Sequence, residues 1–353
     1  MWKHKNFINL QLYATFKHFY DAGTIGTGAV KFRHYSQTEP LPQLATPQNV
    51  AANGTTVSWD EVENATSYAV LADGNEIGTV DYIATKTLEE STWAEIAQVS
   101  ANKSWDAMGW KVGDTKTITL NGTVGTVALN NYQCKVYILG FDHNADKEGQ
   151  GISFGMLEGI DGKQLCLVDG SYNATTSSAT AFIMNTSNTN SGGWKNCHMR
   201  KTILGSTDVT NGDATSAAIT NPASGTLMAA LPSDLRAVLK PITKYTNNVG
   251  KSSAASAITP TVDYLPLLSE YEVFKTHSYA NRNEDAYQAQ YQYYANGKSK
   301  VKYQHNSVSN TAYWRLRSPA AGDSASFCLV LDSGAIYVYN VSLSCGVVPV
   351  FLV

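Results

Sequence analysis

Residues 312–353 decide the fold, and they read AYWRLRSPAAGDSASFCLVLDSGAIYVYNVSLSCGVVPVFLV. Two apolar blocks, 313–319 and 346–353, enclose a middle segment whose apolar residues follow no steady period. Such a pattern is typical of two strands anchored in a core, with exposed connections between them. We therefore predict that 320–345 lies at the surface. The alternative for IYVYNVSL, 336–343, is an ordinary core strand with alternating packing.

The composition predicts a β-rich protein suited to an extracellular or virion setting. Of the 353 residues, 43% are apolar but only 16% are charged, so that Ser, Thr, Asn and Gly supply most of the polarity. The formal net charge is -3, and no run of Lys or Arg occurs. These features exclude the electrostatic footprint of nucleic-acid binding and of attachment to an anionic membrane.

The cysteines and the N-terminus bear on the compartment in which the protein works. The five cysteines are widely spaced without a Cys-x-x-Cys pair, so we expect buried reduced thiols. Residues 1–23 interrupt their apolar runs every few positions and lack the apolar stretch of a signal peptide. No later stretch reaches the roughly 18 apolar residues that span a membrane. A protein made in the bacterial cytoplasm with such a composition fits a virion component, which is released by lysis.

The sequence divides into three parts. Residues 1–43 end in TEPLPQ and are predicted to be an attachment segment and linker. Residues 44–84 carry apolar residues mostly at period two, with turn signals at Asn53-Gly54 and Asp73-Gly74, which predict a small antiparallel β module. Residues 85–353 combine few helices, many short strands and long loops, which predicts an α+β domain.

The module at 44–84 resembles the first strands of a fibronectin type III domain. The resemblance rests on Trp59 in VSWDEV and Tyr68 in ATSYAV. A sandwich domain of this Ig-like kind needs about 100 residues. We therefore expect a partial module that acts as a spacer.

Local signals within 85–353 predict particular elements. Thr92 and Glu95 form a capping-box pattern that begins a short amphipathic helix. The stretch TKTITLNGTVGTVAL, 115–129, alternates around Asn121-Gly122, which predicts a hairpin turn there. The tyrosine-rich stretch 286–297 has no basic residues between its aromatic ones, so we expect it to pack inside the domain and not to stack on a ligand.

The closing segment and several upstream motifs resemble the variable proteins of diversity-generating retroelements. The resemblance covers about residues 85–353 and implies a C-type-lectin-like fold related to the formylglycine-generating enzyme. The matching motifs are YWRLRSP at 313–319, Phe327-Cys328, Gly334, GVVPVFLV at 346–353, VGDTKTITLNG at 112–122, YILGFDHN at 137–144, GGWKNCHMR at 192–200, LMAALPSDLRAVLKPITKYT at 227–246 and VDYLPLLSEYEVF at 262–274.

In that family a reverse transcriptase rewrites template adenines, so that asparagine codons at surface positions change and framework codons are spared. Rewritten Asn codons cannot encode Lys, Glu, Gln, Met or Trp, and 320–345 contains none of these. Because 202–227 also lacks all five, the framework motifs carry the resemblance. By resemblance, the rewritten, ligand-contacting positions are Arg315, Ala320, Ala321, Gly322, Asp323, Ser324, Ala325, Leu329, Leu331, Asp332, Ser333, Ala335, Tyr337, Val338, Tyr339, Asn340, Leu343 and Cys345.

One loop has the spacing of a calcium site. Asp142, Asn144 and Asp146 in GFDHNADKEGQG alternate as the oxygen ligands of a calcium loop do. The Gly and Glu of a full EF-hand loop are absent, so a simple polar turn is the alternative that we favour. The Glu-Pro-Asn and Trp-Asn-Asp motifs of calcium-dependent lectins do not occur either. We expect no metal, no cofactor and no catalytic residue.

These observations together predict a non-enzymatic ligand- or receptor-binding protein on the tail or capsid surface of a phage. Its partners would be a host-surface protein or glycan, bound through about 315–345, and other virion proteins, bound through residues 1–43. A homo-oligomer is compatible with this role, whereas nucleic acid and membrane insertion are not expected. One alternative is a bacterial adhesin with a fixed ligand, which needs an export signal. Another is an enzyme of the formylglycine-generating type, which needs a reactive cysteine pair such as Cys328 and Cys345.

Overall fold

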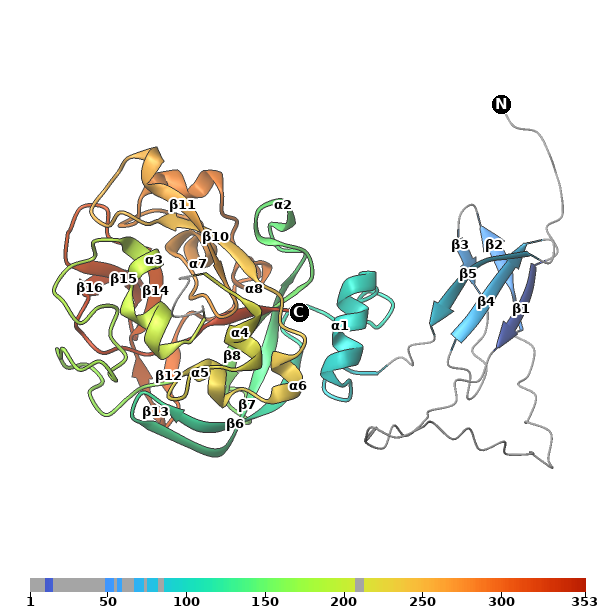
Figure 1. Ribbon diagram of the computed structural model, residues 1–353, viewed down its shortest axis with the longest axis horizontal. Coiled ribbons are helices and arrows are strands. Elements are labelled where there is room, and N and C mark those ends of the chain that lie inside the picture. The colour runs from blue at the N-terminus through green and yellow to red at the C-terminus, as the bar shows by residue number, and fades with distance from the viewer. Residues whose placement is uncertain are drawn as a thin grey trace, which may run out of the picture. The chain divides into compact units, whose positions relative to one another are not determined.

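The computed structural model confirms an α+β protein built from short helices and mostly antiparallel sheets (Figure 1). It describes the main chain of residues 10–14, 48–53, 56–58, 67–72, 75–81, 86–206 and 213–353, and the side chains of 48–50, 86–206 and 213–353. The chain forms two compact units, Met1–Ala84 and Thr85–Val353. The sequence texture changes at the boundary between them. Within the described residues, no helix is long and apolar enough to cross a membrane.

The described strands of the first unit are β1 (Leu10–Ala14), β2 (Ala51–Asn53), β3 (Thr56–Ser58), β4 (Ser67–Ala72) and β5 (Asn75–Asp81). Strand β4 lies between β1 and β5, and β2 pairs with β3. The last described pairs of the β2–β3 and β4–β5 ladders, Asn53 with Thr56 and Ala72 with Asn75, flank the two predicted turn signals in the sequence.

Strand β1 corrects the prediction for residues 1–43. It belongs to the sheet of the module, where Leu12 pairs with Val70, and not to a separate attachment segment. The physical reason is that β4 offers an edge whose backbone groups need partners, and the alternating residues of LQLYA, 10–14, suit a strand that supplies them. The predicted linker at TEPLPQ lies outside the described residues.

The largest sheet of the second unit has four strands in the order β17-β8-β7-β6. The ring of Trp93, at the start of helix α1, meets the rings of Phe154 and Phe351 edge-on, with centroids 5.6 and 6.0 Å away. The capping box predicted at Thr92 and Glu95 is confirmed, because each side chain accepts a hydrogen bond from the backbone of the other. The elements span α1 Trp93–Asn102, β6 Thr115–Val124, β7 Val127–Phe141, β8 Ile152–Glu158 and β17 Val350–Leu352.

The hairpin between β6 and β7 turns at Gly125-Thr126, so the turn predicted at Asn121-Gly122 is wrong. Val124 and Val127 form the last pair of the ladder, and Gly122 lies at an irregularity inside the strand. Gly125 has a φ of +58°, and a Cβ on it would lie 2.1 Å from the carbonyl oxygen of Thr180. A contact with a distant part of the chain therefore selects the turn, at a residue without a side chain.

Short elements connect and cover these strands. Two further sheets form, one from β10 and β11 and one in the order β13-β12-β9. These elements are α2 Ala145–Glu148, β9 Leu165–Cys166, α3 Gly193–Asn196, the π-helix η1 Met199–Ile203, α4 Ser216–Thr220, α5 Leu227–Ala230, α6 Ser233–Arg236, β10 Ile242–Asn247, η2 Ala255–Ala257, β11 Ile258–Asp263, α7 Glu270–Phe274, η3 Arg282–Ala286, α8 Gln292–Ala295, β12 Lys302–Gln304 and β13 Ser307–Ala312.

The segment that decides the fold forms a three-stranded sheet in the order β14-β15-β16, with β14 Trp314–Pro319, β15 Ser326–Val330 and β16 Ile336–Asn340. Every residue of β14 and β15 is buried. Trp314 and Cys328 belong to the main hydrophobic core. The same core contains Tyr291, Tyr293 and Tyr294, which confirms the internal packing predicted for the tyrosine-rich stretch.

Candidate functional site

Strand β16 forms the outer edge of its sheet and alternates between core and solvent. Ile336 and Val338 pack against the main core, whereas Tyr337 and Tyr339 are 42% and 38% exposed. Successive side chains of a strand point to opposite faces, so the two tyrosines share the outer face. Within 336–343, residues 336–340 therefore form an edge strand with one face in solvent, whereas 341–343 are buried, so the surface position predicted for them is wrong.

The two exposed tyrosines belong to a row of four aromatic rings, which we call the tyrosine ridge. Its members are Tyr279, Tyr337, Tyr339 and Tyr313, and neighbouring ring centroids lie 5.7, 5.4 and 5.9 Å apart in that order. Tyr279 and Tyr313 are half-buried and lie outside 320–345. Sequence reasoning missed both, since Tyr279 joins the ridge only through the tertiary fold.

Asn190 anchors the loop between β14 and β15 through the main chain of that loop. Its side-chain amide donates to the carbonyl oxygens of Ala320, Asp323 and Ser326, at 3.3, 2.7 and 2.9 Å. Its backbone nitrogen donates to the carbonyl oxygen of Ser324 at 2.7 Å. Asn190 is 1% exposed. One buried side chain thus fixes the loop without using the loop's side chains.

Arg315 anchors the other end of the surface in the same manner. Its guanidinium donates to the carbonyl oxygens of Tyr339, Asn340 and Leu343, at 3.1, 2.6 and 2.7 Å. The side chain is fully buried, and burial lowers its pKa. Within the described residues it forms no ion pair. Its charge is therefore stabilised by carbonyl dipoles at the end of β16.

Backbone contacts complete the support of 320–345. The amide of Ala321 donates to the carbonyl oxygen of Tyr279 at 2.9 Å, and the amide of Val341 donates to that of Ala325 at 2.8 Å. The amide of Met184 donates to the carbonyl oxygen of Val341, also at 2.8 Å. These bonds use main-chain atoms and do not depend on the identity of the exposed side chains, although the side chains of Asp323 and Asn340 also accept hydrogen bonds within the segment.

The structure divides the residues predicted as ligand contacts into three groups. Exposed are Gly322, Asp323, Ser324, Asp332, Ser333, Ala335, Tyr337 and Tyr339, and half-buried are Ala321, Ala325, Leu331, Val338 and Asn340. Buried are Arg315, Ala320, Leu329, Leu343 and Cys345.

The prediction of a surface position is wrong for the five buried residues. Leu329, Leu343 and Cys345 form a small apolar cluster beneath Tyr313 and Leu331. Arg315 is enclosed by the carbonyl groups that it binds, and Ala320 lies at the end of β14 beside Asn190. These five residues support the surface from inside and are not part of it.

Residues 174–353, just over half of the chain, match the family model DUF6273, described as a domain of unknown function. The chain belongs to the DUF6273 family. No curated protein and no solved structure matches it. The matched region of the DUF6273 protein contains the whole tyrosine ridge and both anchoring residues, Asn190 and Arg315.

All five cysteines of the DUF6273 protein are free and buried, as the sequence predicts. Cys328 belongs to the main core, with its sulfur 3.6 Å from the Glu270 carboxylate, whereas Cys345 belongs to the small apolar cluster. Burial raises the pKa of both thiols. An accessible reactive pair, which the enzyme alternative needs, is not formed by these two residues.

The weak calcium candidate of the DUF6273 protein matches a polar turn. The Asp142 carboxylate accepts from the Gly151 amide at 2.9 Å and pairs with Lys103 at 2.6 Å. The Asn144 amide donates to the Tyr287 carbonyl oxygen at 2.8 Å. The two side chains therefore bind different parts of the protein, and neither needs an ion as a partner.

A second group could in principle hold a metal ion. Ligand atoms of His143, Glu148 and Glu272 lie within 4.8 Å of one another. The Lys244 ammonium, however, binds both carboxylates, that of Glu272 at 2.7 Å, and donates to the Tyr291 hydroxyl at 3.2 Å. Lys244 supplies the positive charge that a metal ion would bring, so this group is a buried structural ion network.

Proposed function

We propose that this DUF6273 protein is a non-enzymatic binding protein of a phage particle, which contacts a protein or glycan on the host surface through the tyrosine ridge and the loops beside it. The observation that carries the proposal is an exposed aromatic surface whose backbone is fixed from below. Tyrosines offer large, rigid contact area at a low cost in conformational entropy. The neighbouring Ser324, Ser333 and Asp332 add adaptable hydrogen-bonding groups.

The surface is suited to sequence diversification on a C-type-lectin-like scaffold. Asn190 and Arg315 hold the main chain of 320–345, so substitutions at the exposed positions leave their bonds intact. The two motifs that enclose the segment are interior, since every residue of 314–319 and 346–353 is buried. A retroelement that rewrites exposed positions and spares these motifs would change the ligand and keep the fold.

On this account the first unit, Met1–Ala84, is a fibronectin type III-like spacer that joins the second unit to the particle. Its sheet, with β1 added at the edge of β4, is a small β structure of the kind that serves as a spacer. Other virion proteins are its proposed partners. A bacterial adhesin would instead be exported and would bind one fixed ligand.

The test is binding of the labelled full-length protein to cells of the host bacterium. The double variant Tyr337→Ala with Tyr339→Ala removes the exposed half of the ridge, and we expect cell binding to fall by about tenfold or more. Its unfolding free energy should stay within about 1 kcal/mol of the parent, because both side chains are surface residues. The matched control is Tyr287→Ala, which removes a tyrosine of a different aromatic pair. Equal binding by the double variant and the control would contradict the proposal.

A further inference from the structure

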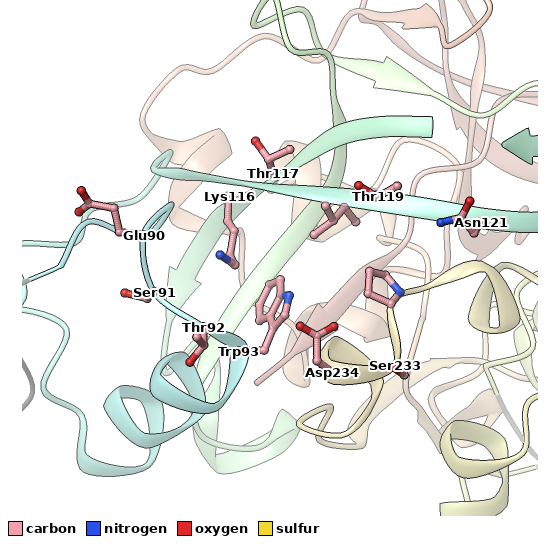
Figure 2. Close-up of a pocket in the computed structure, with 12 residues that line it drawn as sticks. Glu90, Ser91, Thr92, Trp93, Lys116, Thr117, Thr119, Asn121, Ser233 and Asp234 are labelled. Carbon is pink, nitrogen blue, oxygen red and sulfur yellow. The ribbon is translucent and has the colours of Figure 1, made fainter. Parts of the chain in front are cut away.

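A separate pocket of about 550 Å³ lies between β6, the start of α1 and the start of α6 (Figure 2). None of its lining residues belongs to the tyrosine ridge or to 320–345. Its volume is within the range typical of small-molecule sites, roughly 300–1,000 Å³. The proposed function assigns it no role.

The base of the pocket is apolar and rigid. Trp93 is 4% exposed and is held from behind by Phe154 and Phe351. Ile118 from β6 is 3% exposed, and Pro232 lines the pocket ahead of α6. Trp93 and Ile118 therefore close the base of the pocket, and half-buried Pro232 is the apolar side chain of the three that a ligand can contact.

Two opposite charges face the pocket from its two sides. Figure 2 shows Lys116 of β6 and Asp234 of α6 projecting toward the ring of Trp93. The Lys116 ammonium lies 5.8 Å from the centre of that ring and donates to the Glu89 carbonyl oxygen at 3.0 Å. The described part of the chain contains no ion pair between Lys116 and Asp234.

Both charged groups retain hydrogen-bonding capacity for a ligand. An ammonium has three donors, and that of Lys116 uses one on Glu89. The Asp234 carboxylate accepts from the Leu235 amide through Oδ1, and its other oxygen makes no hydrogen bond within the described residues. A ligand placed between Lys116 and Asp234 therefore meets donors on one side and an acceptor on the other.

We propose that this pocket binds one unit of a neutral saccharide. Sugar hydroxyls both donate and accept, so a single ring can satisfy Asp234 and Lys116 together, while its C–H face lies against Pro232. A free amino acid also carries both charges, but Glu89 and Glu95 lie close enough to Lys116 to interact with its charge, and they repel a carboxylate. A cationic ligand meets the repulsion of Lys116. A neutral polyhydroxylated ring is repelled neither by the acidic residues nor by Lys116.

Saturation-transfer NMR on the full-length protein tests this assignment. The probes are glucose, galactose, N-acetylglucosamine and their β-1,4-linked dimers, with glycine and alanine as zwitterionic comparisons. We expect transfer to at least one neutral sugar, weakened about tenfold by Lys116→Met and by Asp234→Asn, since hydrogen bonds to charged groups are among the strongest. The control Asp161→Asn changes an exposed carboxylate elsewhere and should have no effect.

Three results would overturn the saccharide assignment. They are no transfer to any neutral sugar, transfer that is unchanged in both pocket variants, and stronger variant-sensitive transfer to the amino acids. The Tyr337→Ala, Tyr339→Ala double variant should keep its sugar signal, because the pocket does not share residues with the ridge. The proposal therefore succeeds or fails independently of the proposed function.

Discussion

Arg315 and Leu343 are joined by a hydrogen bond of 2.7 Å from the guanidinium Nη2 to the carbonyl oxygen. The bond crosses from the buried strand β14 to the turn that follows β16, and the same nitrogen also reaches the Asn340 carbonyl oxygen at 2.6 Å. A residue expected at the surface is thus the internal support of that surface. Arg315 therefore belongs with the buried positions that hold the backbone, and not with the exposed positions that we propose contact a ligand.

Replacing Arg315 should destabilise the whole protein. In Arg315→Met, the carbonyl groups of Tyr339, Asn340 and Leu343 lose their donors in a buried setting, and we expect the unfolding free energy to fall by about 3 kcal/mol. Urea denaturation measures this change. Arg282→Met, at an exposed arginine, should differ from the parent by less than about 0.5 kcal/mol. Similar stability of the two variants would mean that Arg315 does not anchor β16.

Replacing the side-chain amide nitrogen of Asn190 by oxygen should loosen the loop between β14 and β15. Asn190→Asp keeps the size of the side chain, but a carboxylate cannot donate to the carbonyl oxygens of Ala320, Asp323 and Ser326 and is repelled by them. We expect a loss of about 2–4 kcal/mol and faster hydrogen exchange at 321–326. Asn188→Asp is the matched control, because Asn188 is exposed and its side-chain oxygen accepts from Asn340. Unchanged exchange in Asn190→Asp would refute the anchoring role.

Two glycines with positive φ test the origin of the β6–β7 turn. Gly125→Ala places a Cβ 2.1 Å from the Thr180 carbonyl oxygen, whereas Gly162→Ala, at a φ of +85°, meets nothing within 4 Å. In both variants the left-handed backbone conformation, which Ala disfavours, lowers the unfolding free energy by about 1 kcal/mol. Thermal unfolding should show a further loss of at least about 1–2 kcal/mol for Gly125→Ala alone. Equal losses would show that the contact with Thr180 does not matter.

Stability should depend on pH through Glu284. Burial raises the pKa of this carboxyl from 4.5 to about 7, so the folded protein holds the proton more tightly than the unfolded chain does. The stabilisation is therefore complete below about pH 4.5 and is lost as the pH rises to about 7, by up to about 3 kcal/mol.

The variant Glu284→Gln keeps a neutral side chain at every pH and should reduce this dependence between pH 5 and 7, where Glu148, whose pKa burial also raises to about 7, contributes as well. Denaturation midpoints measured at several pH values give the slope, and Asp285→Asn, at an exposed neighbour, should keep the slope of the parent. A slope in Glu284→Gln as steep as in the parent would show that another group is responsible.

Local patterns predicted local structure well. The capping box at Thr92 and Glu95 depends on residues three apart, and the packing of Tyr291, Tyr293 and Tyr294 was predicted from the absence of basic residues between them. The turn at Gly125-Thr126 was missed because the competing Asn-Gly signal is also local, while the deciding contact with Thr180 is tertiary. Strand β1 was missed for the same reason, since its partner β4 lies far along the chain.

The candidate site could be predicted as a segment but not residue by residue. Period-two alternation within β16 is visible in the sequence and agrees with the exposure of Tyr337 and Tyr339. Burial of Arg315 could not be inferred, because a charged residue is stable inside only when partners such as the Leu343 carbonyl are in place. Tyr279 joins the ridge through a fold that the local pattern does not encode.

Deep sequencing of this gene across a population of lysogens tests the central claim most directly. The account predicts that substitutions concentrate at codons of exposed or half-buried positions, such as Asp323, Asp332, Tyr337 and Tyr339. The codons of Arg315, Ala320, Leu329, Leu343 and Cys345, which are buried, should vary no more than the rest of the gene. Uniformly low variation over 315–345, or variation spread equally over buried and exposed codons, would contradict a diversified ligand-binding surface.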